Sequence, residues 1–256
     1  EAFSASETEL DVRVGPHHFT HRGMDIDLTG TDIPLKGTVL FNDPAPWPVS
    51  LLAPGIMGWY AWVPRMECYH GVLSLDHRLQ GTLYQGGEAL SFDGGRGYIE
   101  KDWGQSFPAG WVWMQTNHFE MPHVSLTASI ARIPWMGSSF TGFIVGLLWH
   151  GALYRFATYT GAQTKRLDVD PQKVIWIIED DLYRLELVGR MAEVGNLKGP
   201  SKTDMGRPVP ETLSAEVDVR LTTRAGHSDQ GTVLFSGTGR HAGMEAAGDL
   251  TVLTSR

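Results

Sequence analysis

Short runs of alternating polar and apolar residues, interrupted by Gly, Pro, Asn and Asp, make up most of the chain. Successive side chains of a β-strand point to opposite faces, so this two-residue period predicts antiparallel strands joined by turns. We expect strands over residues 9–14, 24–28, 37–41, 125–133, 140–148, 153–158, 174–178, 183–188, 215–222 and 231–237. The pattern therefore predicts an all-β protein.

Little helix is expected, because no window carries a sustained apolar stripe with a 3.6-residue period behind a capping residue. One helical turn could form over residues 210–213, and residues 189–210, rich in Gly, Lys and Pro, are expected to form a long loop. The 30 Gly and 14 Pro interrupt the chain at the strand-length spacing of a β-barrel or sandwich. Closure into a barrel would remove the exposed edges of such a meander.

Charge and size narrow the classes of function. The formal net charge is −8, and no dense Lys or Arg block is present to neutralise phosphates, which argues against nucleic acid as a partner. The 256 residues allow one large or two small domains. The one cysteine, Cys68, excludes an internal disulfide bond and is compatible with a reducing compartment. Because we find neither a bilayer-spanning apolar run nor a signal segment, we expect a cytoplasmic protein.

Two blocks of the chain concentrate aromatic, ionisable and glycine residues beyond what a strand face needs. The first spans residues 54–77 and contains Gly58-Trp59-Tyr60-Ala61-Trp62 and Glu67-Cys68-Tyr69-His70. The second spans residues 94–119 and contains Glu100-Lys101-Asp102-Trp103-Gly104-Gln105-Ser106-Phe107-Pro108, followed by Trp111-Val112-Trp113-Met114-Gln115-Thr116-Asn117. These blocks resemble the signature stretches of the tocopherol cyclase-like family, which is related to lipocalins and similar to carotenoid hydratases.

The resemblance extends more loosely from Leu10 to Leu250. It implies two lipocalin-like antiparallel β-barrel or sandwich halves, one over residues 1–120 that carries both blocks and one over residues 121–256. Members of the family also carry an upstream aromatic strand segment that we do not find here. Either the chain is truncated, or it departs from the family pattern.

The resemblance also implies a reaction, an isomerisation in which a prenylated hydroquinone closes to a chromanol. An acid protonates the alkene of the prenyl tail, and the phenolic oxygen captures the resulting cation. No oxidation occurs, so no redox cofactor is expected. Three alternatives stay open: hydration of an isoprenoid alkene, a non-catalytic carrier of an apolar isoprenoid or lipid, and a structural sandwich whose cavity is filled. An apolar substrate suggests loading from a bilayer surface, with transient membrane contact.

Glu100 and Asp102 are the candidate proton donors. Burial in an apolar wall keeps a carboxylic acid protonated by penalising its charged form, and two neighbouring carboxylates raise each other's proton affinity. On an extended segment, Tyr98 shares a face with both carboxylates. The competing interpretation is that Lys101, Arg96 or Arg65 pairs with them at a barrel rim. We favour Asp102 as the acid.

Aromatic side chains can stabilise the cation, because their faces attract positive charge without supplying a nucleophile. The candidates are Trp59, Tyr60, Trp62, Trp103, Trp111 and Trp113. Alternation puts Trp111, Trp113, Gln115 and Asn117 on one strand face, so two indoles and two amides could hold a ring and its polar substituents. The competing interpretation is that these Trp residues only fill a core.

A base must remove the phenolic proton, and His70, His77 and His118 have suitable ordinary pKa values. We favour His70, although a lone His in a β-core is more often structural. The side chains expected to bind substrate are Trp59, Tyr60, Trp62, Glu67, Tyr98, Trp103, Trp111, Trp113, Gln115, Asn117 and His118. His17, His18 and His21 match no recognised metal-ligand spacing, so no metal site is expected.

Overall fold

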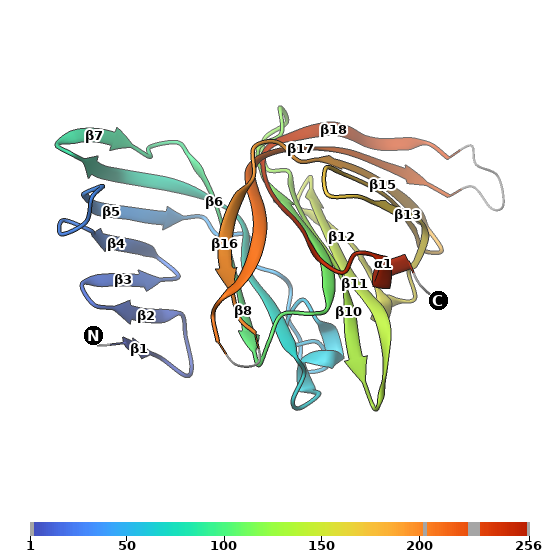
Figure 1. Ribbon diagram of the computed structural model, residues 1–256. Coiled ribbons are helices and arrows are strands. Elements are labelled where there is room, and N and C mark those ends of the chain that lie inside the picture. The colour runs from blue at the N-terminus through green and yellow to red at the C-terminus, as the bar shows by residue number, and fades with distance from the viewer. Residues whose placement is uncertain (1–2, 202–203, 225–230, 255–256) are drawn as a thin grey trace. The chain divides into compact units, whose positions relative to one another are not determined.

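Strands dominate the computed structural model, which describes residues 3–201, 204–224 and 231–254. Helical structure in this part of the chain is limited to two 3-10 turns, η1 (Gly58–Trp62) and η2 (Thr158–Thr160), and the short helix α1 (Thr251–Thr254) (Figure 1). None of the described helices has the length and apolar character needed to cross a membrane. The strands form two antiparallel sheets, which confirms the expected all-β fold with little helix.

The first sheet is a meander of strands that follow one another along the chain. Its order is β1-β2-β3-β4-β5-β6-β7, and β8 pairs with β6. The strands are β1 (Phe3–Ala5), β2 (Asp11–Val14), β3 (His17–Thr20), β4 (Gly23–Asp27), β5 (Leu35–Asn42), β6 (Cys68–Gln85), β7 (Glu88–Ser91) and β8 (Arg96–Gly104). Because β1 and β7 do not pair within the described residues, this sheet keeps two open edges and does not close into a barrel.

The second sheet has the order β12-β11-β10-β9-β18-β17-β15-β14-β13, and β16 pairs with β17. Its strands are β9 (Gly110–Thr116), β10 (Ser125–Trp135), β11 (Ser138–Trp149), β12 (Ala152–Ala157), β13 (Gln163–Val169), β14 (Lys173–Glu179), β15 (Tyr183–Arg190), β16 (Gly195–Gly199), β17 (Arg207–Thr223) and β18 (Val233–Gly248). The last strand, β18, lies beside β9, more than a hundred residues earlier in the chain. The sheet curves into a lipocalin-like half-barrel (Figure 1).

Two local expectations are wrong. Residues 189–210 do not form one long loop, because β16 lies within them and pairs with the start of β17. Residues 210–213 are part of β17 and not a helical turn. In both segments, pairing with a neighbouring strand satisfies the backbone hydrogen-bonding groups and overrides the weak local signal from Gly and Pro.

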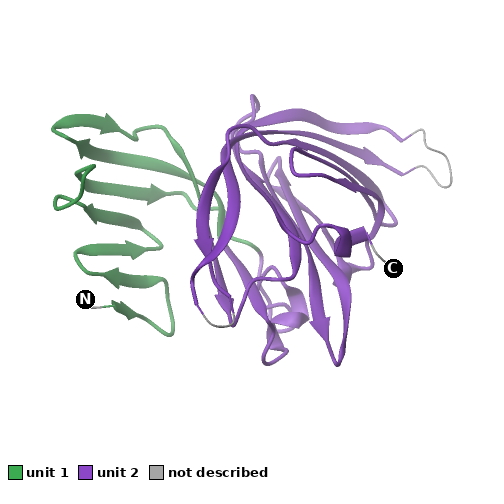
Figure 2. Ribbon diagram, viewed as in Figure 1, with its two compact units in different colours: residues 1–47, 73–99 green, residues 48–72, 100–256 purple. Residues whose placement is uncertain are grey.

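The chain divides into two compact units (Figure 2). Unit 1 comprises residues 1–47 and 73–99, and unit 2 comprises residues 48–72 and 100–256. Strands β6 and β8 each begin in one unit and end in the other. The division into halves over residues 1–120 and 121–256 stays a prediction, and the compact units have different bounds.

Alternation along the central strands of the second sheet separates its two faces. In β9, Val112 and Met114 are fully buried in the main apolar core of unit 2, whereas Trp111 and Trp113 point to the opposite face. In β18, Glu245 pairs in register with Trp113, so the two side chains share that opposite face. One face of the sheet therefore carries the core, and the other is available for a functional cavity.

Gly58 begins η1 and provides the first test of this architecture. Its φ of +58° is strained for any residue with a side chain, and an added Cβ would lie 2.7 Å from the Tyr159 ring. The Tyr159 hydroxyl donates a hydrogen bond to the Ile56 carbonyl at 2.7 Å, so the ring cannot move without breaking this contact. Gly58→Ala should lower the free energy of unfolding by about 1–3 kcal/mol, as measured by urea titration.

Gly55→Ala is the matched control, because a Cβ at Gly55, in the same loop, meets nothing within 4 Å. This control should change the free energy of unfolding by less than about 0.5 kcal/mol. Equal effects of the two substitutions would show that Tyr159 does not constrain η1.

Candidate active site

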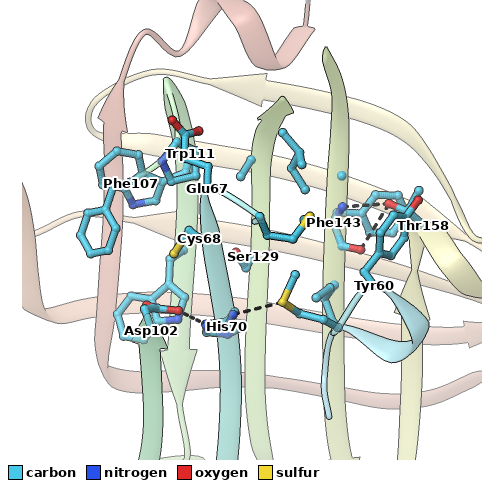
Figure 3. A pocket seen from close by; sticks show the side chains of 18 of the residues that line it. Tyr60, Glu67, Cys68, His70, Asp102, Phe107, Trp111, Ser129, Phe143 and Thr158 are labelled. Carbon is cyan, nitrogen blue, oxygen red and sulfur yellow. Dashed lines mark hydrogen bonds and ion pairs between the residues drawn. The ribbon is translucent and has the colours of Figure 1, made fainter. Parts of the chain in front are cut away.

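A cavity of about 230 Å³ lies within unit 2, on the Trp111 and Trp113 face of the second sheet. Its apolar lining consists of Met57, Tyr60, Met66, Phe107, Pro108, Trp111, Trp113, Ala131, Ile133, Pro134, Phe140, Gly142, Phe143, Ile144 and Tyr159. Its polar lining consists of Glu67, Cys68, His70, Glu100, Asp102, Ser129, Thr158, Glu211 and Glu245. Figure 3 shows His70, Asp102 and Cys68 on one side of the cavity and Tyr60, Phe143 and Thr158 on the other. The cavity is thus mainly apolar, with concentrated ionisable groups.

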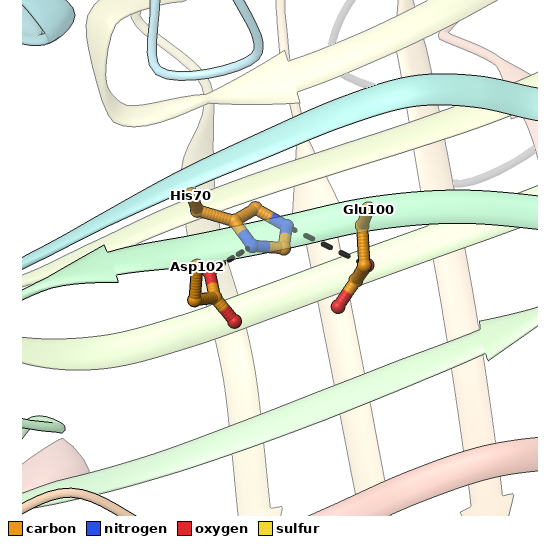
Figure 4. A group of neighbouring side chains, drawn as sticks. All are labelled: His70, Glu100 and Asp102. Atoms are coloured by element: carbon orange, nitrogen blue, oxygen red, sulfur yellow. Dashed lines mark hydrogen bonds and ion pairs between the residues drawn. The ribbon is translucent and has the colours of Figure 1, made fainter. Parts of the chain in front are cut away.

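His70 lies between two carboxylates at one wall of the cavity (Figure 4). Its Nδ1 donates a hydrogen bond to Asp102 Oδ1 at 2.7 Å, and its Nε2 lies 3.9 Å from Glu100 Oε2. The paired strands β6 and β8 supply the three residues, and the two-residue period puts Glu100 and Asp102 on the same face of β8. Strand pairing therefore brings together residues that are thirty positions apart in the chain.

The protonation of His70 depends on its two carboxylate neighbours. Burial by itself lowers the pKa of His70, but the hydrogen bond to Asp102 and the negative charges of Glu100, Asp102 and Glu245 outweigh this effect and raise the pKa above its ordinary value. Among the described residues the buried Nε2 has no hydrogen-bond partner, since 3.9 Å exceeds hydrogen-bond distance. This nitrogen therefore has no competing hydrogen bond at the cavity wall.

Two tryptophans of β9 orient two carboxylates at the cavity. Trp113 Nε1 donates a hydrogen bond to Glu100 Oε2 at 3.1 Å, and Trp111 Nε1 donates one to Glu245 Oε2 at 2.5 Å. The guanidinium of Arg207 lies 4.8 Å from the centre of the Trp111 ring. Each indole thus satisfies its N–H and still presents part of its ring to the cavity.

Glu245 is a carboxyl group of the cavity whose protonation is strongly affected by burial. Burial raises its pKa to about 7, and the negative charges of Glu211, Asp102 and Glu100 act in the same direction, while the hydrogen bond from Trp111 opposes them. Glu211 pairs with Glu245 across β17 and β18, and burial raises the pKa of Glu211 as well. At neutral pH a substantial fraction of Glu245 is therefore the neutral acid.

Residues 46–248 match the family model described as tocopherol cyclase-like. The chain belongs to the tocopherol cyclase-like family. It is 24% identical over 202 residues to a chloroplastic tocopherol cyclase of Zea mays and 25% identical over 199 residues to a probable one of Oryza sativa subsp. japonica. These alignments cover 75% of this chain, which spans only 41% and 42% of the lengths of those two plant proteins.

Solved structures support the fold of this tocopherol cyclase-like protein. Kievitone hydratase from Nectria haematococca superposes with a TM-score of 0.51 at 13% identity, covering 96% of this chain and 73% of the hydratase. CghA superposes with a TM-score of 0.50 at 11% identity, covering 89% of this chain and 64% of CghA. At such low identity these two similarities extend to the fold and not to the chemistry.

Seven of the residues expected from the sequence line this cavity. They include residues predicted to be catalytic and residues predicted to bind substrate. The expected acids and base are Asp102, Glu100 and His70, and the expected substrate-binding residues are Tyr60, Glu67, Trp111 and Trp113. These seven come from four separate segments of the chain. Their roles stay predictions, and their common location is what makes them testable together.

Other expected substrate-binding residues lie elsewhere. Trp59, Trp62 and Trp103 are exposed, and the Trp103 ring stacks on Tyr69 at 5.3 Å. Gln115, Asn117 and His118 lie beyond Trp113 toward and past the end of β9 and do not line the cavity, and Tyr98 belongs to unit 1. Alternation along β9 does put Gln115 on the face of Trp111 and Trp113, but the cavity ends before it reaches Gln115.

Two of the basic side chains considered as partners of Glu100 and Asp102 have other contacts. Arg96 binds Asp76 within unit 1, and the Lys101 ammonium lies 4.7 Å from the centre of the Trp103 ring. The sequence reasoning missed Glu211 and Glu245, which lie in the last two strands. Glu245 is in the stretch Ala242-Gly243-Met244-Glu245 that shares the family resemblance, but in isolation it looks like a solvent-facing residue of an alternating strand.

His70, Glu100 and Asp102 could also hold a metal ion, because each offers one ligand atom and these atoms lie within 4.8 Å of one another. Two carboxylates and an imidazole suit a divalent cation. Of the histidine cluster near the N-terminus, His18 instead binds Asp11 at 3.0 Å, and His17 accepts a hydrogen bond from the Asp27 amide at 3.1 Å.

The raised pKa of Glu245 predicts a pH-dependent cost in stability. Between pH 4.5, the ordinary pKa, and about pH 7, the carboxyl group is ionised in the unfolded chain but still protonated in the folded protein. The free energy of unfolding therefore falls as the pH rises through this range. Glu245→Gln removes this cost. The free energy of unfolding of the variant relative to the parent should increase by up to about 3 kcal/mol between pH 4.5 and pH 8.

The control for this measurement is Glu216→Gln, which changes a half-exposed carboxylate of β17 outside the cavity. Because Glu216 does not line the cavity, its replacement should leave the pH dependence assigned to Glu245 in place. Parallel pH curves for the parent and Glu245→Gln would mean that Glu245 is solvated in the folded protein.

Proposed function

We propose that the cavity of unit 2 catalyses a proton-initiated addition to an isoprenoid alkene, as an isomerase that closes a prenylated hydroquinone to a chromanol. The observation that carries this proposal is the placement of Glu245 and the His70–Asp102 pair in one aromatic cavity. The acid and the base that the reaction needs are then available at the same site. The family match and the plant tocopherol cyclases support the same class of chemistry.

Glu245 is the proton donor in this proposal. Alkene protonation needs a neutral carboxylic acid, and Glu245 has a pKa of about 7 and lies against Trp111. Asp102, favoured from the sequence, accepts a hydrogen bond from His70, and Glu100 accepts one from Trp113. These two oxygens are already engaged by ring N–H groups, so the proposal gives Asp102 and Glu100 the role of orienting His70 and facing the cation.

The cation forms next to aromatic side chains. Protonation converts the π bond of the alkene into a C–H bond and leaves a tertiary cation, which the faces of Trp111, Trp113, Tyr60 and Phe140 can stabilise without reacting with it. Tyr60 and Phe140 stack at 5.9 Å, which holds both rings in place. The apolar walls also exclude water that would trap the cation.

The His70–Asp102 pair accepts the phenolic proton. As the phenolic oxygen bonds to the cation, its O–H bond breaks and the proton passes to His70 Nε2, while Asp102 holds Nδ1–H and stabilises the imidazolium. One proton enters at carbon and one leaves from oxygen, so the reaction is an isomerisation. Exchange with solvent then returns a proton to Glu245 for the next turnover.

Hydration is the second candidate function. The unpartnered Nε2 of His70 could bind and deprotonate a water molecule in place of a phenol, which would convert the same cation into a tertiary alcohol. A carrier has less support, because transport needs no buried carboxylic acid such as Glu245. Product analysis separates these functions.

Incubation with a prenylated benzoquinol in deuterated buffer tests the proposal directly. The chromanol product should carry one deuteron at the former alkene carbon, detected by mass spectrometry and NMR. A tertiary alcohol would select the hydratase function. Tight binding of the quinol without deuterium uptake would support a carrier and contradict both enzymatic functions. Parallel assays with EDTA and with added Mg²⁺ show whether a metal ion at His70 takes part.

Conservative variants assign the roles. Glu245→Gln keeps the size and shape of the side chain but removes the acidic carboxyl proton, so it should lower kcat by about 10²-fold or more. Asp102→Asn should also slow the reaction, because it weakens the base, whereas Glu216→Gln should not change the rate. If Glu245→Gln keeps the parent rate while Asp102→Asn or Glu100→Gln loses it, the acid is one of the two carboxyl groups favoured from the sequence.

The pH dependence of kcat should follow both groups. The rate should fall as pH rises past about 7, because Glu245 loses its proton there. It should also fall on the acidic side, where the imidazole, whose pKa is raised by Asp102 and Glu100, becomes protonated. A rate that stays constant from pH 6 to pH 9 would exclude Glu245 as the proton donor.

A further inference from the structure

Unit 2 exposes a group of large apolar side chains that the proposed chemistry does not use. Exposed fractions range from 47% for Trp59 to 92% for Met136. The group, which we name the apolar tip, consists of Val49, Leu51, Leu52, Trp59, Trp62 and Met136. Five of these residues lie in the loop before η1 or in η1 itself, and Met136 lies in the β10–β11 turn. Figure 1 shows η1 and this turn at the same end of unit 2.

Specific contacts hold the apolar tip in its exposed position. Trp62 Nε1 donates a hydrogen bond to the Leu51 carbonyl at 3.0 Å, so its polar atom is satisfied while most of its ring faces outward. The Trp59 ring meets the edge of Trp135 at 6.4 Å, which joins the loop to the hairpin. Defined contacts therefore hold these indoles at the surface. Single apolar residues scattered over a surface are common, but a cluster fixed in this way indicates an interaction site.

Charge around the apolar tip differs from that of the whole protein. The net charge is −8, but residues 44–66 and 132–142 contain no Asp or Glu. The charged residues of these segments and of the neighbouring β12 are Arg65, Arg132 and Arg155. Arg65 follows η1, Arg132 lies in the β10–β11 hairpin, and Arg155 lies 5.9 Å from the centre of the Tyr159 ring that packs against Gly58 of η1. An apolar surface whose own segments carry arginines and no carboxylates is complementary to a bilayer, whose acyl chains accept the apolar side chains and whose phosphates attract the guanidinium groups.

The apolar tip is continuous with the cavity. Tyr60 in η1 lines the cavity while its neighbour Trp59 is exposed, and in the hairpin Pro134 and Phe140 line it while Met136 is exposed. The same two segments therefore form the outer surface and part of the cavity wall. We propose that the apolar tip docks unit 2 on a lipid bilayer containing anionic phospholipid, from which an apolar substrate enters the cavity. Substrate entry rests on the proposed function, whereas docking does not.

Co-sedimentation with phosphatidylcholine vesicles containing phosphatidylglycerol tests docking without substrate. The parent protein should bind, and Leu51→Asp combined with Leu52→Asp should lower the partition coefficient at least about tenfold, since it places two charges at the acyl boundary. The matched control is Leu182→Asp combined with Leu213→Asp, two exposed leucines of unit 2 outside the apolar tip. This control should bind like the parent.

Substitution of the arginines tests the electrostatic part. Arg65→Gln combined with Arg155→Gln should weaken binding to vesicles containing phosphatidylglycerol and leave any binding to phosphatidylcholine alone unchanged. Equal binding by the apolar tip variant, its control and the parent would overturn the proposal. So would failure of the parent to bind, and if the parent instead dimerised in solution through Leu51 and Leu52, the tip would be an interface between copies.

An activity measurement separates docking from catalysis. With substrate dispersed in detergent, Leu51→Asp combined with Leu52→Asp should keep the parent rate, because neither residue lines the cavity. With substrate embedded in vesicles the same variant should lose at least about tenfold, in proportion to its lost binding. Vesicle binding without turnover of any prenylated quinol would leave docking standing and contradict the proposed function.

Discussion

The site depends on the desolvation of carboxyl groups on one face of a sheet whose other face is an apolar core. Because Val112 and Met114 are packed in the core, Trp111 and Trp113 must point to the opposite face, where covering segments exclude water. Glu245 shares that face through its register with Trp113. A carboxyl group in this position cannot be well hydrated, so its neutral form is favoured near neutral pH.

The carboxyl groups of the cavity differ in their hydrogen-bond partners and in their surroundings. Asp102 and Glu100 each accept a bond from a ring N–H, of His70 and Trp113 respectively, and both face the imidazole. Glu245 receives one bond from Trp111, but burial and the negative charges of neighbouring carboxylates raise its pKa to about 7. Such different environments would let an acid and a base coexist in one cavity, as the proposed function requires.

The family relationship and the geometry contribute different information. The family match covers most of the chain and supports a class of chemistry, while the chain spans less than half of the plant relatives' length. The geometry supplies what a motif cannot, namely which side chains share a cavity. It also shows that the segments that form the apolar tip contribute part of the cavity wall.

The sequence by itself determined the all-β class, the scarcity of helix and the two blocks that contain His70, Glu100 and Asp102, since alternation and motif spacing are local properties. Tertiary structure alone decided that β18 returns beside β9 and brings Glu245 into the cavity, because strand pairing over more than a hundred residues leaves no local signal. It also decided that Trp59, Trp62 and Trp103 are exposed while Trp111 and Trp113 line the cavity. Alternation predicts that a strand has two different faces, but only the packing of the folded chain determines what covers each face.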